Sequence, residues 1–259
     1  MSRFASALLI FAFVLPVFAS QATELNTTAE ALMIRGSWED ARRTFLRLHS
    51  LLEKTLGPAH PQTVLALANA CDASVPLAAR LNSIPICRRA LELNEKLAPN
   101  SRETVKTISD LALLYAAEGD LTRASKLLGR ALRITGTTDS PEAAALMNNL
   151  GYLYFRRGKY TQARDMFERA IAAAGDAAAP GVTPDGSDRV TMLGNLGTAE
   201  LAAHDARAAE VHFRRALSLA EDSFGRDHVK YLKALDNLSR AEAALGNKAN
   251  ALTSSAAMP

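Results

Sequence analysis

The chain has 259 residues, of which 48% are hydrophobic and only 6% are aromatic. This length allows one elongated domain or two compact ones, and the shortage of aromatic residues favours closely packed helices over a β-sandwich. The formal charge of +3 is spread over interspersed acidic and basic residues, so no strong field indicates nucleic acid or an acidic surface as the partner.

The N-terminal segment has the pattern of a secretory signal peptide. One positive charge, Arg3, precedes an apolar run over residues 4–18, and small residues follow that run. Cleavage is expected after Ala19 or after Ala22, so residues 1–22 are predicted to be a signal peptide and the mature chain to be periplasmic or secreted. An uncleaved N-terminal anchor is the alternative. No stable membrane insertion is expected after removal, because no later segment is apolar enough to span a bilayer.

Beyond this segment, one template recurs along the chain. Around Ala163, a glycine lies five residues earlier at Gly158, and a large residue lies four residues later at Phe167. Similar patterns recur at intervals of 39 to 46 residues. The six anchors are Ala41, Ser83, Ala124, Ala163, Ala209 and Ala251. Six copies at a nearly constant period indicate a repeat protein, not an active-site segment or an isolated hairpin.

Each copy predicts two helices joined by a short turn. The first helix carries apolar residues at helical spacing, as at Leu150 and Tyr154, and the second carries small and large residues on one face. Linkers rich in Pro, Gly, Asp and His separate the copies. The longest linker, residues 176–188, is predicted to be a flexible loop, and the repeats are predicted to fill residues 23–257.

This pattern resembles the tetratricopeptide repeat (TPR) family. In that family small residues occupy positions 8, 20 and 27 of each repeat, and large ones positions 4, 7, 11 and 24. With the anchor at position 20, the fourth copy supplies Met147, Leu150, Gly151, Tyr154, Ala163, Phe167 and Ala170. The long period and the linkers that begin at Gly57 and Gly225 are similar to those of kinesin light chains. The resemblance implies an all-α fold, a right-handed TPR superhelix or α-solenoid of about six helix–turn–helix repeats.

The resemblance also implies a ligand-binding groove. In a TPR superhelix the first helices line the concave face and position 6 points toward it, and here four of five such positions hold asparagine. An asparagine amide both donates and accepts hydrogen bonds, so it can hold the backbone of an extended peptide. The predicted groove residues are Asn69, Asp110, Asn148, Asn149, Tyr152, Phe155, Arg156, Asn195, Thr198, Lys233, Asn237 and Arg240. The alternative is that asparagine at position 6 is a helix-face residue inherited with the repeat.

Within this set, Lys233 and Arg240 are suited to hold an acidic group of the ligand, although Asp236 lies between them. Tyr152, Phe155 and Arg156 are predicted to help select side chains of the ligand.

Other chemistry is not indicated. No two of the five histidines are spaced on a helix with an acidic helper as a zinc hydrolase requires, and His60 and His228 fall in equivalent linkers. No nucleophile elbow and no phosphate-binding loop occur. Arginines recur on the second helices, as at Arg169, but acidic residues such as Glu168 accompany them. We therefore predict no catalytic residue, no metal site, no cofactor and no nucleic-acid partner.

The two cysteines, Cys71 and Cys87, fall at positions 8 and 24 of the second copy. These positions lie on matching faces of the two helices, so a disulfide is predicted. This copy lacks a turn glycine and carries Pro76 and Pro85, and a bridge would stabilise such a hairpin by about 3 kcal/mol. The alternative is a pair of buried thiols that pack as small hydrophobic groups.

The sequence thus predicts an exported, non-catalytic scaffold that binds an extended peptide or protein segment in its concave groove. One alternative is a structural or assembly adaptor that acts through the convex face or the end repeats. Another is an accessory enzyme. The identity of the protein partner and the oligomeric state do not follow from the sequence.

Overall fold

The computed structural model describes residues 2–77, 83–136, 140–175 and 187–246. This described part contains eleven α-helices, one short 3-10 helix and no strand. The chain divides into two compact units, Met1–Leu127 and Leu128–Pro259, and the boundary falls within one helix. Each unit is built from helices that follow one another along the chain.

The first unit contains α1 (Ser2–Ile34), α2 (Trp38–Leu56), α3 (Pro61–Asp72), the 3-10 helix η1 (Val75–Leu77), α4 (Ile84–Leu97), α5 (Arg102–Ala117) and the start of α6 (Leu121–Thr135). The second unit contains the rest of α6, α7 (Pro141–Arg156), α8 (Tyr160–Ala174), α9 (Ser187–Ala202), α10 (Ala206–Phe224) and α11 (Val229–Ala244).

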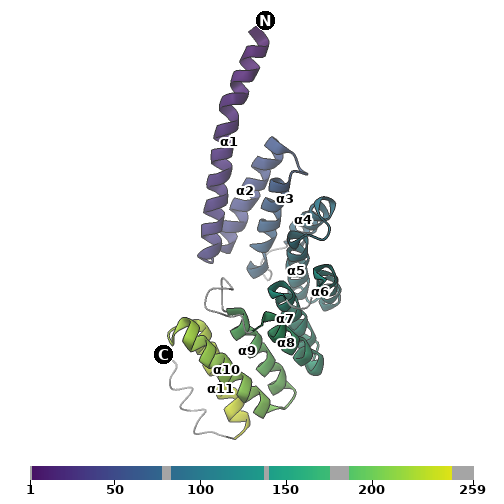
Figure 1. The fold of residues 1–259 in the computed structure, drawn as a ribbon, viewed down its shortest axis with the longest axis vertical. Coiled ribbons are helices and arrows are strands. Elements are labelled where there is room, and N and C mark those ends of the chain that lie inside the picture. Colours follow the sequence, from purple (N-terminus) through teal and green to yellow (C-terminus); the bar gives the residue numbers. More distant parts are fainter. Residues whose placement is uncertain (1, 78–82, 137–139, 176–186, 247–259) are drawn as a thin grey trace. The chain divides into compact units, whose positions relative to one another are not determined.

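Successive helices pack against one another in each unit, as the repeat predicts. In the first unit α1 contacts α2, α2 contacts α3, and α3 contacts α4 (Figure 1). In the second unit the same is true of α7 with α8, α9 with α10, and α10 with α11. The predicted all-helical architecture of helix–turn–helix repeats, an α-solenoid, is therefore confirmed. The second helix of the sixth copy, around Ala251, and residues 176–186 of the predicted loop lie outside the described residues.

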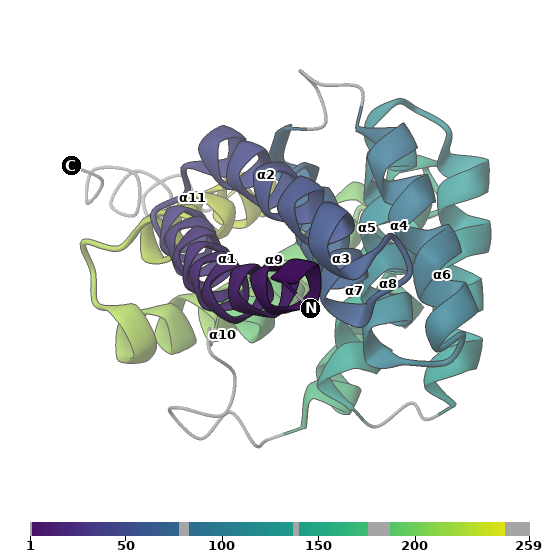
Figure 2. The same cartoon turned by 90° about the horizontal axis from the view of Figure 1, so that it is seen from above.

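The first helix continues without a break through both predicted cleavage positions. Figure 2 looks along α1 from above and shows α2 beside it. Leu25, Leu32 and Met33 pack against the buried cluster that contains Ala29 and Phe45, so the C-terminal part of α1 is the first helix of the first copy. Among the described helices, none is both long enough and apolar enough to cross a membrane.

The two helices of a copy meet where position 8 faces position 24. A Cβ atom added at Gly151 would lie 2.7 Å from the ring of Phe167, and one added at Gly197 would lie 2.6 Å from the ring of Phe213. Both rings are fully buried, so neither can move aside into solvent. The glycines therefore allow the two backbones to approach while the ring fills the space between them.

In the second copy the same two positions are joined covalently. Cys71 and Cys87 form a disulfide, with their Cα atoms 4.9 Å apart, and both residues are fully buried. The bond connects α3 to α4 at the positions where, in the fourth and fifth copies, a phenylalanine ring packs against a glycine and holds the two helices together. It thus supplies the closing contact in the hairpin that carries Pro76 in η1 and Pro85 in the first turn of α4.

The linker histidines are helix caps. His60 and His228 each precede the first residue of a helix, and each ring Nδ1 accepts a hydrogen bond from the backbone N–H two residues later, at 3.3 Å from Gln62 and at 3.2 Å from Lys230. Such a bond satisfies one of the amide groups that a helix leaves unpaired at its start. Ser101 makes the corresponding bond at the start of α5. The sequence placed these histidines in linkers but did not indicate the role that the structure shows.

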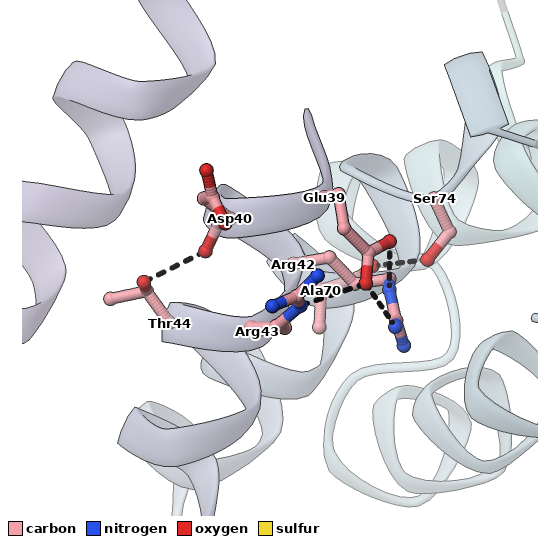
Figure 3. A network of polar contacts seen from close by, with 7 residues as sticks. All are labelled: Glu39, Asp40, Arg42, Arg43, Thr44, Ala70 and Ser74. Atoms are coloured by element: carbon pink, nitrogen blue, oxygen red, sulfur yellow. Dashed lines mark hydrogen bonds and ion pairs between the residues drawn. The ribbon is translucent and has the colours of Figure 1, made fainter. Parts of the chain in front are cut away.

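The start of α2 is organised differently. Ser37 makes no side-chain capping bond, and instead Arg42 and Arg43 both donate to the Glu39 carboxylate at 2.9 Å (Figure 3). The hydrogen bond from Arg42 and, to a smaller extent, that from Arg43 hold the pKa of Glu39 below its usual value. A carboxylate in the first turn of a helix is also favoured by the helix dipole.

Two buried carboxylates distinguish the last two copies. Position 11 holds a tyrosine in the third and fourth copies, but Glu200 and Glu242 in the fifth and sixth, and both glutamates are nearly inaccessible. His212 Nδ1 lies 2.8 Å from the Glu200 carboxylate, and Arg214 donates to Glu242 at 2.9 Å. The hydrogen bond to Glu200 raises the pKa of His212. Since both partners project from α10, this helix is joined to α9 by the His212–Glu200 hydrogen bond and to α11 by the Arg214–Glu242 ion pair.

The contact at Gly197 can be tested by adding one methyl group. Gly197→Ala would overlap the buried Phe213 ring, so the free energy of unfolding is expected to fall by about 1–3 kcal/mol. Gly194→Ala, on the same helix, is the matched control. Its new Cβ would lie 3.8 Å from the nearest atom, so a gain of up to about 1 kcal/mol from helix propensity is expected. Urea denaturation followed by circular dichroism measures both. Equal effects of the two substitutions would contradict this account of the hairpin.

Candidate peptide-binding surface

In the second unit the first helices of neighbouring copies contact one another, α7 with α9 and α9 with α11. This contact brings position 6 of one copy to position 5 of the copy before it. The Asn195 amide nitrogen donates a hydrogen bond to the Asn148 side-chain oxygen at 2.9 Å. Among the described residues the two side chains make no other hydrogen bond. The Asn148 amide N–H groups and the Asn195 carbonyl oxygen therefore remain available to a ligand.

The next copy repeats this geometry with one change. The Asn237 amide nitrogen lies 3.8 Å from the position that a Cβ of Gly194 would occupy, so Asn237 also faces position 5 of the preceding copy. Glycine offers no side chain there, and Arg240 instead donates to the Asn237 oxygen at 3.2 Å. The predicted asparagines thus act with their position-5 neighbours, a pairing that the repeat pattern alone did not specify.

Tyr152 and Arg156 form an exposed pair on α7. The Arg156 guanidinium lies 5.8 Å from the centre of the Tyr152 ring and donates to its hydroxyl at 3.2 Å. Tyr152 is 40% exposed, which is unusual for so large an apolar ring. Phe155 is placed otherwise, because its half-buried ring lies 5.5 Å from the ring of Tyr160 and packs against a buried cluster. Of the three residues expected to select ligand side chains, the structure therefore brings Tyr152 and Arg156 together and turns Phe155 toward the core.

The Thr198 hydroxyl donates to the Gly194 carbonyl at 2.7 Å, so its proton is used within its own helix. Asn149 is half-buried, as are Asn148 and Asn195.

Three cations on the first helices have no carboxylate partner among the residues that the structure describes: Arg156, Lys233 and Arg240. On the second helices of this unit, Arg164, Arg169 and Arg214 are paired with acidic side chains, whereas Arg207 and Arg215 have no carboxylate partner among the described residues. Asp236 is exposed on α11 near Lys233 and Arg240 in the sequence. We call the predicted groove residues on the first helices the inner positions. Those of the second unit carry more positive than negative charge, and that charge is available to an acidic ligand.

In the first unit, position 6 of the third copy has another role. Asp110 is 8% exposed, and the Lys106 ammonium lies 3.4 Å from its carboxylate and 2.7 Å from that of Asp72. Burial raises the pKa of Asp110 to about 7, although the charge of Lys106 works in the opposite direction. The Asp110 carboxyl group is buried, whereas the Asn195 and Asn237 amides of the second unit are half-buried, so Asp110 is less accessible to a ligand.

Asn69 and Asn26 occupy positions 6 and 5 of the second and first copies, the same relation that Asn195 and Asn148 have. Both line one hollow of the first unit. No group of three His, Cys, Asp or Glu side chains in the described ranges is arranged to hold a metal ion. What the described inner positions offer is hydrogen bonding, positive charge and apolar contact.

Comparison with known proteins supports the same architecture. The tetratricopeptide repeat family model matches residues 135–176 and 188–254, which supports the TPR family. No curated protein sequence matches the chain.

Three solved structures illustrate the fold. The nearly identical TPR-like repeats assigned to a kinesin light chain of Podosopora anserina are 17% identical, with a TM-score of 0.63 over 76% of this chain and 94% of that one. BtubC (BKLC) of P. vanneervenii is 20% identical, with a TM-score of 0.64 over 87% of each chain. A Rap protein in complex with Competence and Sporulation Factor is 13% identical, with a TM-score of 0.65 over 88% of this chain and 71% of that one. At these identities the similarity establishes the fold.

The position of Asp110 generates a pH prediction. The folded chain keeps this proton up to about pH 7, whereas the unfolded chain releases it near pH 4, so Asp110 lowers the free energy of unfolding as pH rises through that interval. Asp110→Asn removes this titration and is expected to flatten that part of the profile. Asp236→Asn, at an exposed aspartate, should leave the profile unchanged. Denaturant unfolding at pH 4, 5.5, 7 and 8 makes the comparison. An identical fall in the parent and in Asp110→Asn would refute this role for burial.

Proposed function

We propose that this protein is an exported, non-catalytic scaffold that binds an extended peptide or protein segment along the inner positions of its first helices. The observation that carries the proposal is the Asn148–Asn195 pair, which leaves donors and an acceptor unused. An extended backbone offers one donor and one acceptor at each residue, so it complements this pair without requiring a particular side chain.

The surroundings of the pair define the kind of segment that fits. Arg156, Lys233 and Arg240 favour a segment with carboxylates, and the exposed ring of Tyr152 offers apolar contact beside them. The Rap protein with the same type of fold was solved in complex with Competence and Sporulation Factor, so a fold of this kind can hold a partner. From this comparison we propose only that the chain binds a partner, and we do not propose that the partner is the same.

Export is supported by two features of the first unit. The N-terminal residues have the charge, apolar run and small residues of a signal peptide. The buried Cys71–Cys87 disulfide suits an oxidising compartment, where such bonds form and persist.

Export can be tested by expressing the full chain in bacterial cells that have a periplasm. We expect the protein in the periplasmic or secreted fraction, with a new N-terminus at Ser20 or Thr23. Alkylation under denaturing conditions should modify two thiols only after reduction, as measured by intact mass. A chain that keeps Met1, remains in the cytoplasm and carries two free thiols would contradict the proposal.

The binding surface can be tested with Asn148→Ala combined with Asn195→Ala. Each lost hydrogen bond is expected to cost about 1 kcal/mol, so the loss of one bond at each asparagine should weaken binding about thirtyfold. The readout is the amount of partner that each variant recovers from an envelope extract of the native host. Arg164→Ala with Glu168→Ala is the matched control, because it removes an exposed ion pair on a second helix and should cost little stability.

The comparison also separates this proposal from the alternative adaptor function. If the asparagine variant recovers the same partners as the parent, binding along the inner positions is wrong. If the α8 variant alone loses them, the second helices carry the interaction, as an assembly adaptor would require.

A further inference from the structure

The first unit contains a hollow of about 440 Å³ bounded by α1, α2 and α3. Leu48 and Leu52 of α2 form buried parts of its lining, and Leu56 and Leu65 are 41% and 46% exposed. No charged side chain lines it. Two of the few large apolar side chains that the described structure exposes are therefore gathered at one concavity.

The repeat pattern makes these leucines unusual. Leu65 is at position 2 of the second copy, and the same position holds Thr23, Lys106, Ala145, Thr191 and Lys233 in the other copies. Leu48 and Leu52 are at positions 27 and 31 of the first copy, where the fourth and fifth copies have alanine. The hairpin fold does not require large apolar residues at these places, since other copies form without them. Exposed apolar surface of this kind is commonly a binding surface.

The polar part of the lining indicates what would bind. Asn26 donates to the Glu30 carboxylate at 2.8 Å, whereas the Asn69 amide has no hydrogen-bond partner among the described residues. A peptide backbone supplies both a donor and an acceptor for Asn69, and its side chain reaches the adjacent leucines. A lipid acyl chain offers nothing to the amide. A charged side chain would lose water without gaining a counter-charge.

We infer that this hollow is a side-chain pocket for an extended segment of the partner, with the backbone on Asn69 and a Leu-, Met- or Phe-sized side chain on Leu56 and Leu65. The inference rests on the proposed function and adds an apolar specificity position in the first unit. Phe18, Ala19 and Ala22 also line the hollow and belong to the predicted signal peptide, residues 1–22. Removal of these residues would widen the hollow on its α1 side, whereas Leu56, Leu65 and Asn69 lie on α2 and α3 and would remain.

The experiment uses the full gene product as recovered from the cell envelope. The probe is a pooled library of nonapeptides with random flanks around a central photo-leucine, cross-linked by light and mapped by mass spectrometry. Adducts are expected on α2 and α3 near Leu56 and Leu65. Leu65→Thr places the residue of two other copies at position 2, so the hairpin is retained, and it should reduce the adducts at the hollow about tenfold. Asn69→Ala should reduce them several-fold.

Leu97→Asp is the matched control, because Leu97 is a 43% exposed leucine outside the hollow, and it should leave the adducts unchanged. Adducts confined to α7, α9 and α11 would overturn the pocket and leave the proposed function standing. Adducts at the hollow that Leu65→Thr does not reduce would also overturn the pocket. So would a photoreactive palmitate that prevents the peptide adducts and itself cross-links at the hollow. No adducts at all, together with partner recovery that Asn148→Ala with Asn195→Ala does not change, would overturn both proposals.

Discussion

The contact between position 8 and position 24 is the interaction on which the hairpins of the second, fourth and fifth copies depend. In the fourth and fifth copies it is a steric fit, in which a glycine leaves room for a buried phenylalanine ring. In the second copy it is the Cys71–Cys87 bond, with a Cα separation of 4.9 Å. Both solutions hold the two helices of a copy at close range. Successive first helices of the second unit also contact one another, and there a hydrogen bond joins Asn148 and Asn195.

The sequence predicted the parts of the structure that follow from spacing. The period, the helical hairpins and the places of Gly151, Ala163 and Phe167 follow from small and large residues at fixed intervals. The pairing of Asn195 with Asn148 could not be predicted in the same way, because it joins side chains 47 residues apart and depends on how closely two helices approach.

The surroundings of the buried carboxyl groups also did not follow from the repeat pattern. Asp110 shares position 6 with the asparagines, but it is buried beside Lys106, and only the structure shows its surroundings. Glu200 and Glu242 are detectable from the sequence, because they occupy position 11, where the third and fourth copies have tyrosine. A charged residue at a core position predicts a hydrogen-bonding or oppositely charged partner on an adjoining helix. His212 and Arg214 of α10 are those partners.

The ion pairs of α10 limit how this chain can change by gain or loss of copies. Repeat proteins are often treated as arrays of interchangeable modules, each stabilised by its immediate neighbours. Here Arg214 belongs to the fifth copy and Glu242 to the sixth, so moving either copy elsewhere would remove this ion pair from the buried Glu242 carboxylate. Because the Arg214 side chain is 54% exposed, the loss is expected to be smaller than the ~3–5 kcal/mol typical of pairs with both partners buried. The last two copies are therefore best regarded as one inherited block, whose order is set by electrostatics as well as by shape.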